Sequence, residues 1–108
     1  MHYPKLQILI DHLKSVESDD FNMLDSVFYV PCCIGGHAKR ILNRDEGLSD
    51  EYLTCDEALN KLCDLPYDIG SDVAYYYPES LEDNPASKDI AVKMLENLRD
   101  TGKVNWDV

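Results

Sequence analysis

Residues 31–42 read PCCIGGHAKRIL and form the least polar segment in the middle of an acidic chain. On a helix, the apolar side chains and one histidine of this segment would share a stripe with the spacing i, i+1, i+4, i+5 and i+8. The residues of that stripe are Cys33, Ile34, His37, Ala38 and Ile41. Gly35 and Gly36 oppose a helix by about 1 kcal/mol each relative to alanine, but they also allow another backbone to pass close by. We therefore predict a buried helix, with a tight turn at the two glycines as the alternative.

Cys33 and His37 are four residues apart, which on a helix is close enough for an imidazole to activate a thiolate. The sequence offers no oxyanion donors and no third orienting group beside them. We therefore interpret Cys33, Gly36 and His37 as structural residues, and we expect no catalytic residue and no enzyme activity. A Cys/His-dependent enzyme remains an alternative function.

Metal binding is a second chemistry that these residue types suggest, because the four cysteines and His37 are all possible zinc ligands. Their spacing contains no C-x-x-C pair, and Cys55 and Cys63 are eight residues apart, about two helical turns. The aspartates that recur every four residues from Asp64 to Asp72 lack the order of a calcium-binding loop. We predict no metal site and no cofactor, and we interpret these aspartates as a solvated acidic loop.

Four further segments carry helical signals, namely residues 4–16, 54–65, 72–77 and 84–101. In the first and last of them, apolar residues recur at helical spacing and predict one buried face each. Thr54 with Glu57 three residues later forms a capping box at the start of a helix. Gly102 follows the last segment as a left-handed stop signal.

The connections between these helices are predicted from proline, glycine and charge. Pro66 and Gly70 predict that residues 67–71 form a loop, and residues 79–83 are predicted to form an acidic linker. In the short helix between them, we expect Val73, Ala74 and Tyr77 to face inward and Tyr75 and Tyr76 to face outward. Tyr75 and Tyr76 are either an interface hot spot or two ordinary surface residues.

Extended structure is expected at two places. Val27–Val30 is a short β-prone run that needs a partner strand, and Val104–Trp106 follows the last helix. Trp106 is the only tryptophan, and we expect it to pack structurally beside Val104. The predicted fold is therefore mainly α: one compact domain over residues 1–108 with four to five short helices, together with a small two-stranded pairing as an option.

Several of these segments carry a resemblance to a known family. They are Phe21-Asn22-Met23, Cys33-Ile34-x-Gly36-His37-Ala38, Leu62-x-x-Leu65 with Ala74-x-x-Tyr77, and Thr101-Gly102-Lys103-Val104-Asn105-Trp106. In this order they resemble small bacteriophage proteins with the patterns F-D-M, C-G-T-x-x-C-I-x-G-H/W-A, L-F and T-G-x-V-D-W, a family with no assigned activity. The chain departs from the pattern at Phe28, which stands where the first cysteine would be. The resemblance implies a phage setting and no particular chemistry.

Negative charge is concentrated in the middle of the chain, which has 21 acids, 10 bases and a net charge of −11. Residues 1–44 hold five acids and five bases, and residues 90–108 hold three of each. Residues 45–89 hold thirteen acids against two bases, so they carry the whole excess. Nucleic acids and anionic membranes would be repelled by this segment and are not expected as direct partners.

These features favour a small acidic accessory protein that binds and inhibits a host protein with a basic surface. In the sharpest form of this hypothesis, the carboxylates mimic the charge of nucleic acid and occupy the groove of a nucleic-acid-binding protein, in an anti-defence or host-takeover role. The interaction residues predicted for it are Asp68, Asp72, Tyr75, Tyr76, Glu79, Glu82 and Asp83. The alternative is an oligomer that binds or sequesters a small molecule in a pocket near Cys33 and His37.

The sequence also predicts where the chain works. No segment approaches the ~20 apolar residues of a membrane span. Asp11 and His12 interrupt the apolar run near the N-terminus, which does not match a signal peptide. We expect a cytoplasmic protein with reduced thiols, located in the host cytoplasm if a phage encodes it.

Overall fold

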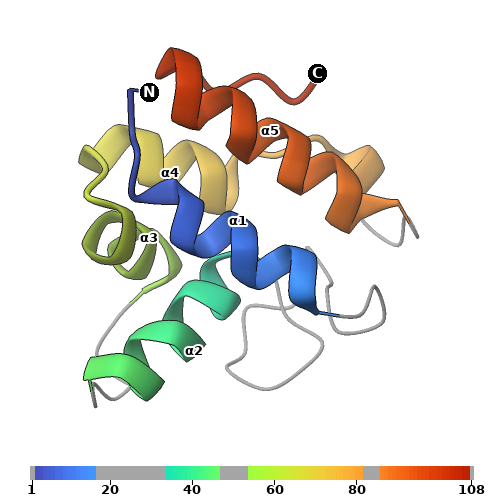
Figure 1. Cartoon of the computed structure of the whole chain (residues 1–108). Coiled ribbons are helices and arrows are strands. Elements are labelled where there is room, and N and C mark those ends of the chain that lie inside the picture. Colours follow the sequence, from blue (N-terminus) through green and yellow to red (C-terminus); the bar gives the residue numbers. More distant parts are fainter. Residues whose placement is uncertain (1, 17–33, 47–53, 82–85, 108) are drawn as a thin grey trace.

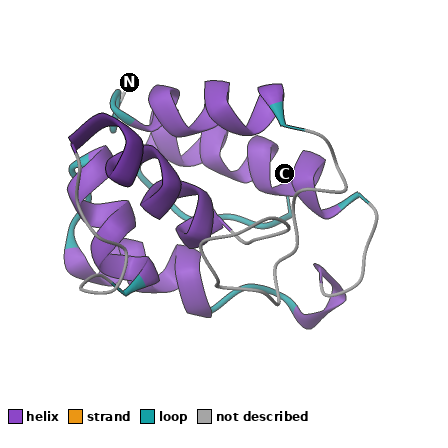
Figure 2. Cartoon of the chain, turned by 90° about the horizontal axis from the view of Figure 1, so that it is seen from below, coloured by secondary structure: helices purple, strands orange, loops and turns teal. Residues whose placement is uncertain are grey.

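Every regular element in the described part of the chain is helical. The computed structural model describes residues 2–16, 34–46, 54–81 and 86–107, and within these ranges it contains helices and no strand (Figures 1 and 2). The helices are α1 (Leu6–Ser15), α2 (Ile34–Glu46), α3 (Cys55–Cys63), α4 (Tyr67–Tyr75), the short 3-10 helix η3 (Glu79–Leu81) and α5 (Ser87–Thr101). The prediction of a mainly α, single-domain fold is confirmed.

Helices α1 and α5 lie side by side (Figure 1). Each buries one stripe of apolar residues at helical spacing, as their periodicity predicts. The buried residues are Leu6, Leu9, Ile10 and Leu13 in α1, and Ala91, Val92, Met94, Leu95 and Leu98 in α5. The backbone N–H groups of His2 and Tyr3 both donate to the carbonyl of Arg99, at 2.6 and 2.9 Å. The start of the chain is therefore tied to the end of α5.

Helix α2 contains both glycines of the segment at residues 31–42 and packs against α3. A Cβ atom added to Gly35 would lie 2.3 Å from the Cβ of Cys55 and 2.9 Å from its Cα. Because no real side chain fits in that space, Gly35 is what allows the two helices to approach. The predicted helix with a close neighbouring backbone is confirmed, although the described helix begins at Ile34.

Helix α4 corrects the prediction of a loop over residues 67–71. Pro66 precedes the helix as its N-cap residue, with φ −62° and ψ 154°, and its carbonyl accepts a hydrogen bond of 3.1 Å from the N–H of Gly70. A proline in this place removes no hydrogen bond from the helix interior. Gly70 is buried in close contact with Asn60 of α3: a Cβ atom added at Gly70 would lie only 1.9 Å from the Asn60 Oδ1 atom. Tertiary packing of α4 on α3 thus outweighs the local cost of the glycine.

Two segments outside the α-helices differ in part from the predictions, namely the residues after α4 and the residues after α5. The predicted acidic linker begins with η3, whose Leu81 is buried in the core, while Glu82 and Asp83 lie outside the described residues. After α5, Gly102 adopts the predicted left-handed conformation with φ 76°. Val104 and Trp106 then pack half-buried against the core without forming a strand, and the expected partner run at residues 27–30 lies outside the described residues.

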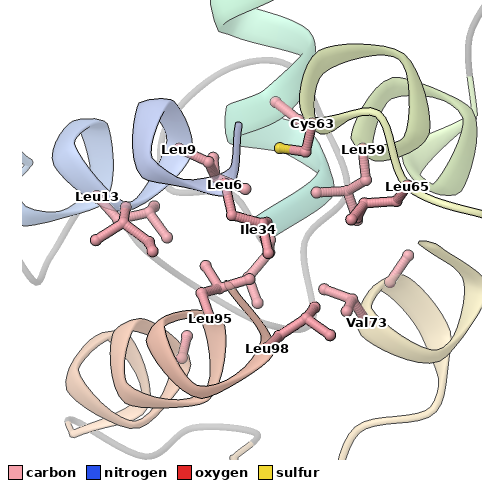
Figure 3. Close-up of a cluster of buried hydrophobic side chains, with 14 of the residues drawn as sticks. Leu6, Leu9, Leu13, Ile34, Leu59, Cys63, Leu65, Val73, Leu95 and Leu98 are labelled. Atoms are coloured by element: carbon pink, nitrogen blue, oxygen red, sulfur yellow. The ribbon is translucent and has the colours of Figure 1, made fainter. Parts of the chain in front are cut away.

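One core joins the helices. Figure 3 shows side chains from all five α-helices converging on it, with Ile34 of α2 between Leu6 of α1, Leu95 of α5 and Leu59 of α3. The Cα radius of gyration is 12.3 Å, close to the ~13 Å of a compact domain of this length. No helix in the described ranges is long and apolar enough to cross a membrane.

Candidate interaction face on helices α3 and α4

The solvent-facing side of α4 carries three tyrosines and two aspartates. Tyr67, Tyr75 and Tyr76 are 74%, 50% and 72% exposed, and Asp68 and Asp72 are exposed beside them. Ser71 lies half-buried between the two ends of the helix. We call these six residues the α4 stripe: Tyr67, Asp68, Ser71, Asp72, Tyr75 and Tyr76.

The opposite side of α4 explains why this stripe points outward. Gly70, Val73 and Ala74 are buried, and the helix packs on α3 through them. On a helix, residues four apart lie above one another, so burying positions 70, 73 and 74 turns positions 68, 71, 72, 75 and 76 toward solvent. Tyr67 is exposed at the first position of the helix. The packing that makes the helix possible therefore also creates the stripe.

The stripe lies in the most acidic part of the described chain. Residues 54–81 contain six acids against one base, a formal excess of five negative charges. Asp56 is buried, and the other five are exposed, namely Glu57, Asp64, Asp68, Asp72 and Glu79. Residues 2–16 and 86–107, which form α1 and α5 with their ends, hold five acids against six bases. Within the four described ranges, the excess of acids over bases therefore lies on α3, α4 and η3.

Beneath this face, Asp56 is buried, with only 6% of its surface exposed. Its Oδ1 atom accepts hydrogen bonds from the Thr54 hydroxyl and, at 3.1 Å, from the Tyr75 hydroxyl, while Oδ2 accepts from Ser71 at 3.4 Å. The bond from Thr54 above all, and then the bond from Tyr75, hold the pKa of Asp56 below its usual value of 3.8 although burial opposes this. Burial, together with the bond to Asp56, raises the pKa of Tyr75 above its usual value of 10.0.

The Thr54 cap places Asp56 where α3 begins. The Glu57 N–H donates to the Thr54 hydroxyl at 3.4 Å, and the Thr54 N–H donates to the Glu57 carboxylate at 3.3 Å, so the predicted capping box is confirmed. A carboxylate in the first turn also faces the positive end of the helix dipole. Asp56 therefore remains ionised although it is buried, and it links the start of α3 to the end of α4.

The histidine of residues 31–42 takes part in a different contact. His37 is fully buried, and its Nδ1 atom lies 3.0 Å from the Nε2 atom of the half-buried His12 on α1. Gly36 is buried next to it in α2. Cys33, predicted to be its structural partner, lies outside the described residues. The structure thus pairs His37 with a histidine of another helix.

The described cysteines sit in the core. Cys55 and Cys63 are buried on α3, and burial raises the pKa of Cys63 to about 12, which keeps that sulfur protonated near neutral pH. Within the four described ranges, no three histidine, cysteine, aspartate or glutamate side chains gather as ligands of one metal ion.

A groove of about 320 Å³ lies between α1 and α5, away from the α4 stripe. Its lining carries three lysines and two acids, and comprises Lys14, Lys88, Asp89, Val92, Lys93 and Glu96. Lys88 donates a hydrogen bond of 2.6 Å to the carbonyl of Val16, and Lys14 forms an ion pair of 3.4 Å with Glu96. Two of the three lysines thus already bind groups of the protein itself.

The structure brings some of the predicted interaction residues together and not others. Asp68, Asp72, Tyr75 and Tyr76 share one face, and Glu79 is exposed on η3, the next element along the chain. Sequence reasoning missed Tyr67, Ser71 and Asp56. The spacing Tyr67, Ser71, Tyr75 is i, i+4, i+8, and it would have revealed the stripe had residues 67–71 been read as helical.

A scan against protein-family models and searches of curated proteins and of solved structures found no match to this chain.

Proposed function

We propose that this protein is a binding protein and not an enzyme, and that the α3–α4 face docks on a cationic surface of another protein. The observation that carries the proposal is the α4 stripe, where three exposed tyrosine rings alternate with carboxylates in the most acidic part of the described chain. Tyrosine offers a large, rigid contact surface at a low entropy cost, and it is enriched among the residues that dominate interface energetics.

The mechanism would be competition for a basic groove. Exposed carboxylates at Glu57, Asp64, Asp68, Asp72 and Glu79 stand in for phosphates and speed up encounter with a positively charged surface. In the sharpest form of the proposal, the partner is a nucleic-acid-binding host protein that is inhibited by this charge mimicry. The resemblance to small phage proteins motivates the host setting, with an anti-defence or host-takeover role in the host cytoplasm.

The arrangement carries a cost in stability that a partner would offset. Asp68 and Asp72 are four residues apart on α4, and like charges at that spacing destabilise a helix by about 0.2–0.5 kcal/mol. A cation placed between these two carboxylates removes the repulsion. This supports a cationic partner over an apolar one, since an apolar surface would have to desolvate both carboxylates.

The test compares two charge variants in pull-downs from host lysate at low and high salt, followed by binding kinetics with the captured protein. The face variant neutralises three exposed acids, Asp68→Asn, Asp72→Asn and Glu79→Gln. The control removes the same charge from the balanced side of the molecule, Asp11→Asn, Asp89→Asn and Asp107→Asn. We expect the face variant to associate more slowly and with a weaker salt dependence, and the control to behave like the parent. Equal loss of binding in both variants would contradict a localised face.

A second candidate function is the binding of a small anionic molecule, which the groove with Lys14, Lys88 and Lys93 favours. Native mass spectrometry of the purified protein tests it, with a retained mass as the supporting result. Lys93→Ala removes an exposed lysine of the groove, and loss of the retained mass in this variant would assign the ligand to the groove.

A further inference from the structure

The α4 stripe consists of two parallel rows of side chains. One row is Tyr67, Ser71 and Tyr75, and the other is Asp68, Asp72 and Tyr76, each with a spacing of four residues. The first row spans about 12 Å along the helix, at a rise of about 1.5 Å per residue. Side chains three or four residues apart are neighbours on a helix surface. Asp72 is therefore flanked by Tyr75 and by Tyr76, so that a carboxylate and two aromatic rings border the same patch of solvent.

We propose that this patch selects arginine over lysine in the partner, which rests on the proposed function and specifies its chemistry. A guanidinium is planar, pairs with a carboxylate through two parallel hydrogen bonds and stacks on an aromatic face. An ammonium group is compact and strongly hydrated, and it does not combine these two contacts in one plane. The occupant of the α4 stripe is thus an arginine-bearing segment of another protein, with its guanidinium at Asp72, between Tyr75 and Tyr76.

The side chain of Tyr75 is already fixed in position before such a contact forms. Its ring is 50% exposed, while its hydroxyl is bound to the buried carboxylate of Asp56 at 3.1 Å. The hydroxyl is therefore occupied inside the protein, and the ring is left as a fixed platform at the surface. A platform that is already ordered loses less conformational entropy on binding than a freely rotating side chain. Asp56 acts here as a positioning residue.

Charge favours this occupant over the others that an exposed aromatic face could take. A second copy of the chain would bring a further net charge of −11, and nucleic acid would bring phosphates, so both would be repelled by the excess of acids in residues 54–81. An arginine-bearing segment is attracted by the carboxylates and is also stabilised by the rings.

The test uses fluorescently labelled hexa-arginine and hexa-lysine peptides as probes, which carry equal charge, with affinities measured at low and at physiological salt. We expect the arginine peptide to bind about two- to five-fold more tightly if one guanidinium stacks on a ring beside Asp72. The variant Tyr75→Leu with Tyr76→Leu removes the two rings beside Asp72 and should abolish the preference. The matched variant Tyr75→Phe with Tyr76→Phe loses the same Tyr75 hydroxyl but keeps both rings, and should retain most of the preference. Ile8→Ala, which changes an exposed apolar residue on α1, should have no effect.

The outcomes separate this inference from the function on which it rests. Equal, salt-dependent binding of both peptides overturns the arginine preference and leaves the acidic docking face intact. Failure of both peptides to bind at low salt overturns both. A preference that survives in the leucine variant assigns it to carboxylates alone and also overturns the inference. Tyrosine ring-proton shifts in the parent protein give a second readout: a shift at Tyr3 with none at Tyr75 and Tyr76 on adding hexa-arginine would contradict the proposed location.

Discussion

The hydroxyl of Tyr75 donates a hydrogen bond of 3.1 Å to the carboxylate of Asp56, which connects the end of α4 to the first turn of α3. The two residues are nineteen positions apart in the chain. The contact serves two purposes, because it holds a negative charge in a buried place and fixes an aromatic ring at the surface.

Stability should depend on pH through Asp56. Its pKa in the folded protein is below the usual value of 3.8, so its ionised form stabilises the fold above that pH. This contribution to the free energy of unfolding decreases as the pH falls below 3.8, and it is lost once the pH has fallen through the lower pKa that Asp56 has in the folded protein. Chemical unfolding as a function of pH measures this, and the slope should be smaller in Asp56→Asn. An unchanged slope would mean that another carboxylate dominates.

Asp56→Asn should also lower the free energy of unfolding at neutral pH by about 1–3 kcal/mol. The amide cannot accept from Thr54, Ser71 and Tyr75 as a carboxylate does, and it loses the favourable interaction with the helix start. Glu57→Gln, in the same turn but exposed, is the control and should cost less. Urea titrations at pH 7 compare the two.

Gly35→Ala should destabilise the protein by about 1–3 kcal/mol, despite the helix propensity that alanine adds. The new Cβ would meet the backbone and Cβ of Cys55, which cannot move without shifting α3. Gly70→Ala is the comparison, since its Cβ would meet the amide end of the Asn60 side chain, which is able to turn away. The melting temperature of Gly35→Ala should be lower than that of Gly70→Ala, and the reverse order would contradict the packing described for α2 and α3.

Cys63 should resist alkylation in the folded protein. Its side chain is buried and its pKa is raised to about 12, so the thiolate that reacts with iodoacetamide is scarce at pH 8. Peptide mass mapping after a timed reaction should show Cys63 unmodified in the native protein and fully modified in denaturant. Rapid native labelling would indicate that α3 opens readily.

Truncation after Lys103 should lower the free energy of unfolding by about 1–3 kcal/mol, which is less than the ~3–5 kcal/mol typical of losing a fully buried tryptophan. Trp106 and Val104 are only partly buried against the core, and the truncation removes both. The measurement is a denaturant titration, and the indole emission of the intact protein is the control. Emission typical of a fully hydrated indole would contradict the observed packing.

The sequence predicted the helices whose signals are local. The apolar stripe from Leu6 to Leu13, the capping box at Thr54 and the stop at Gly102 each involve residues within a few positions of one another. The first half of α4, residues 67–71, was missed because Pro66 and Gly70 argue against a helix locally, whereas Asn60 of α3 supplies the contact that favours it. The α4 stripe was therefore recognised only in part: Asp68, Asp72, Tyr75 and Tyr76 were predicted as interaction residues, and Tyr67 and Ser71 were missed.

The contact between His12 and His37 could not be predicted from the sequence either, because the two residues lie on different helices and are twenty-five positions apart in the chain. Only a three-dimensional arrangement places Nε2 of one ring 3.0 Å from Nδ1 of the other. His37 falls on the buried face of α2, and the half-buried His12 lies beside the buried residues of α1. Periodicity indicates such faces, but it does not tell which residues of two faces meet.

Because of the contact between His12 and His37, the packing of α1 against α2 depends on the position of a single hydrogen atom. At 3.0 Å, one of the two facing nitrogens has to carry the hydrogen and the other has to present a lone pair. If both carried one, two N–H groups would point at each other and the rings would be pushed apart. The junction between these two helices is thus compatible with some tautomeric states of the two rings and incompatible with others.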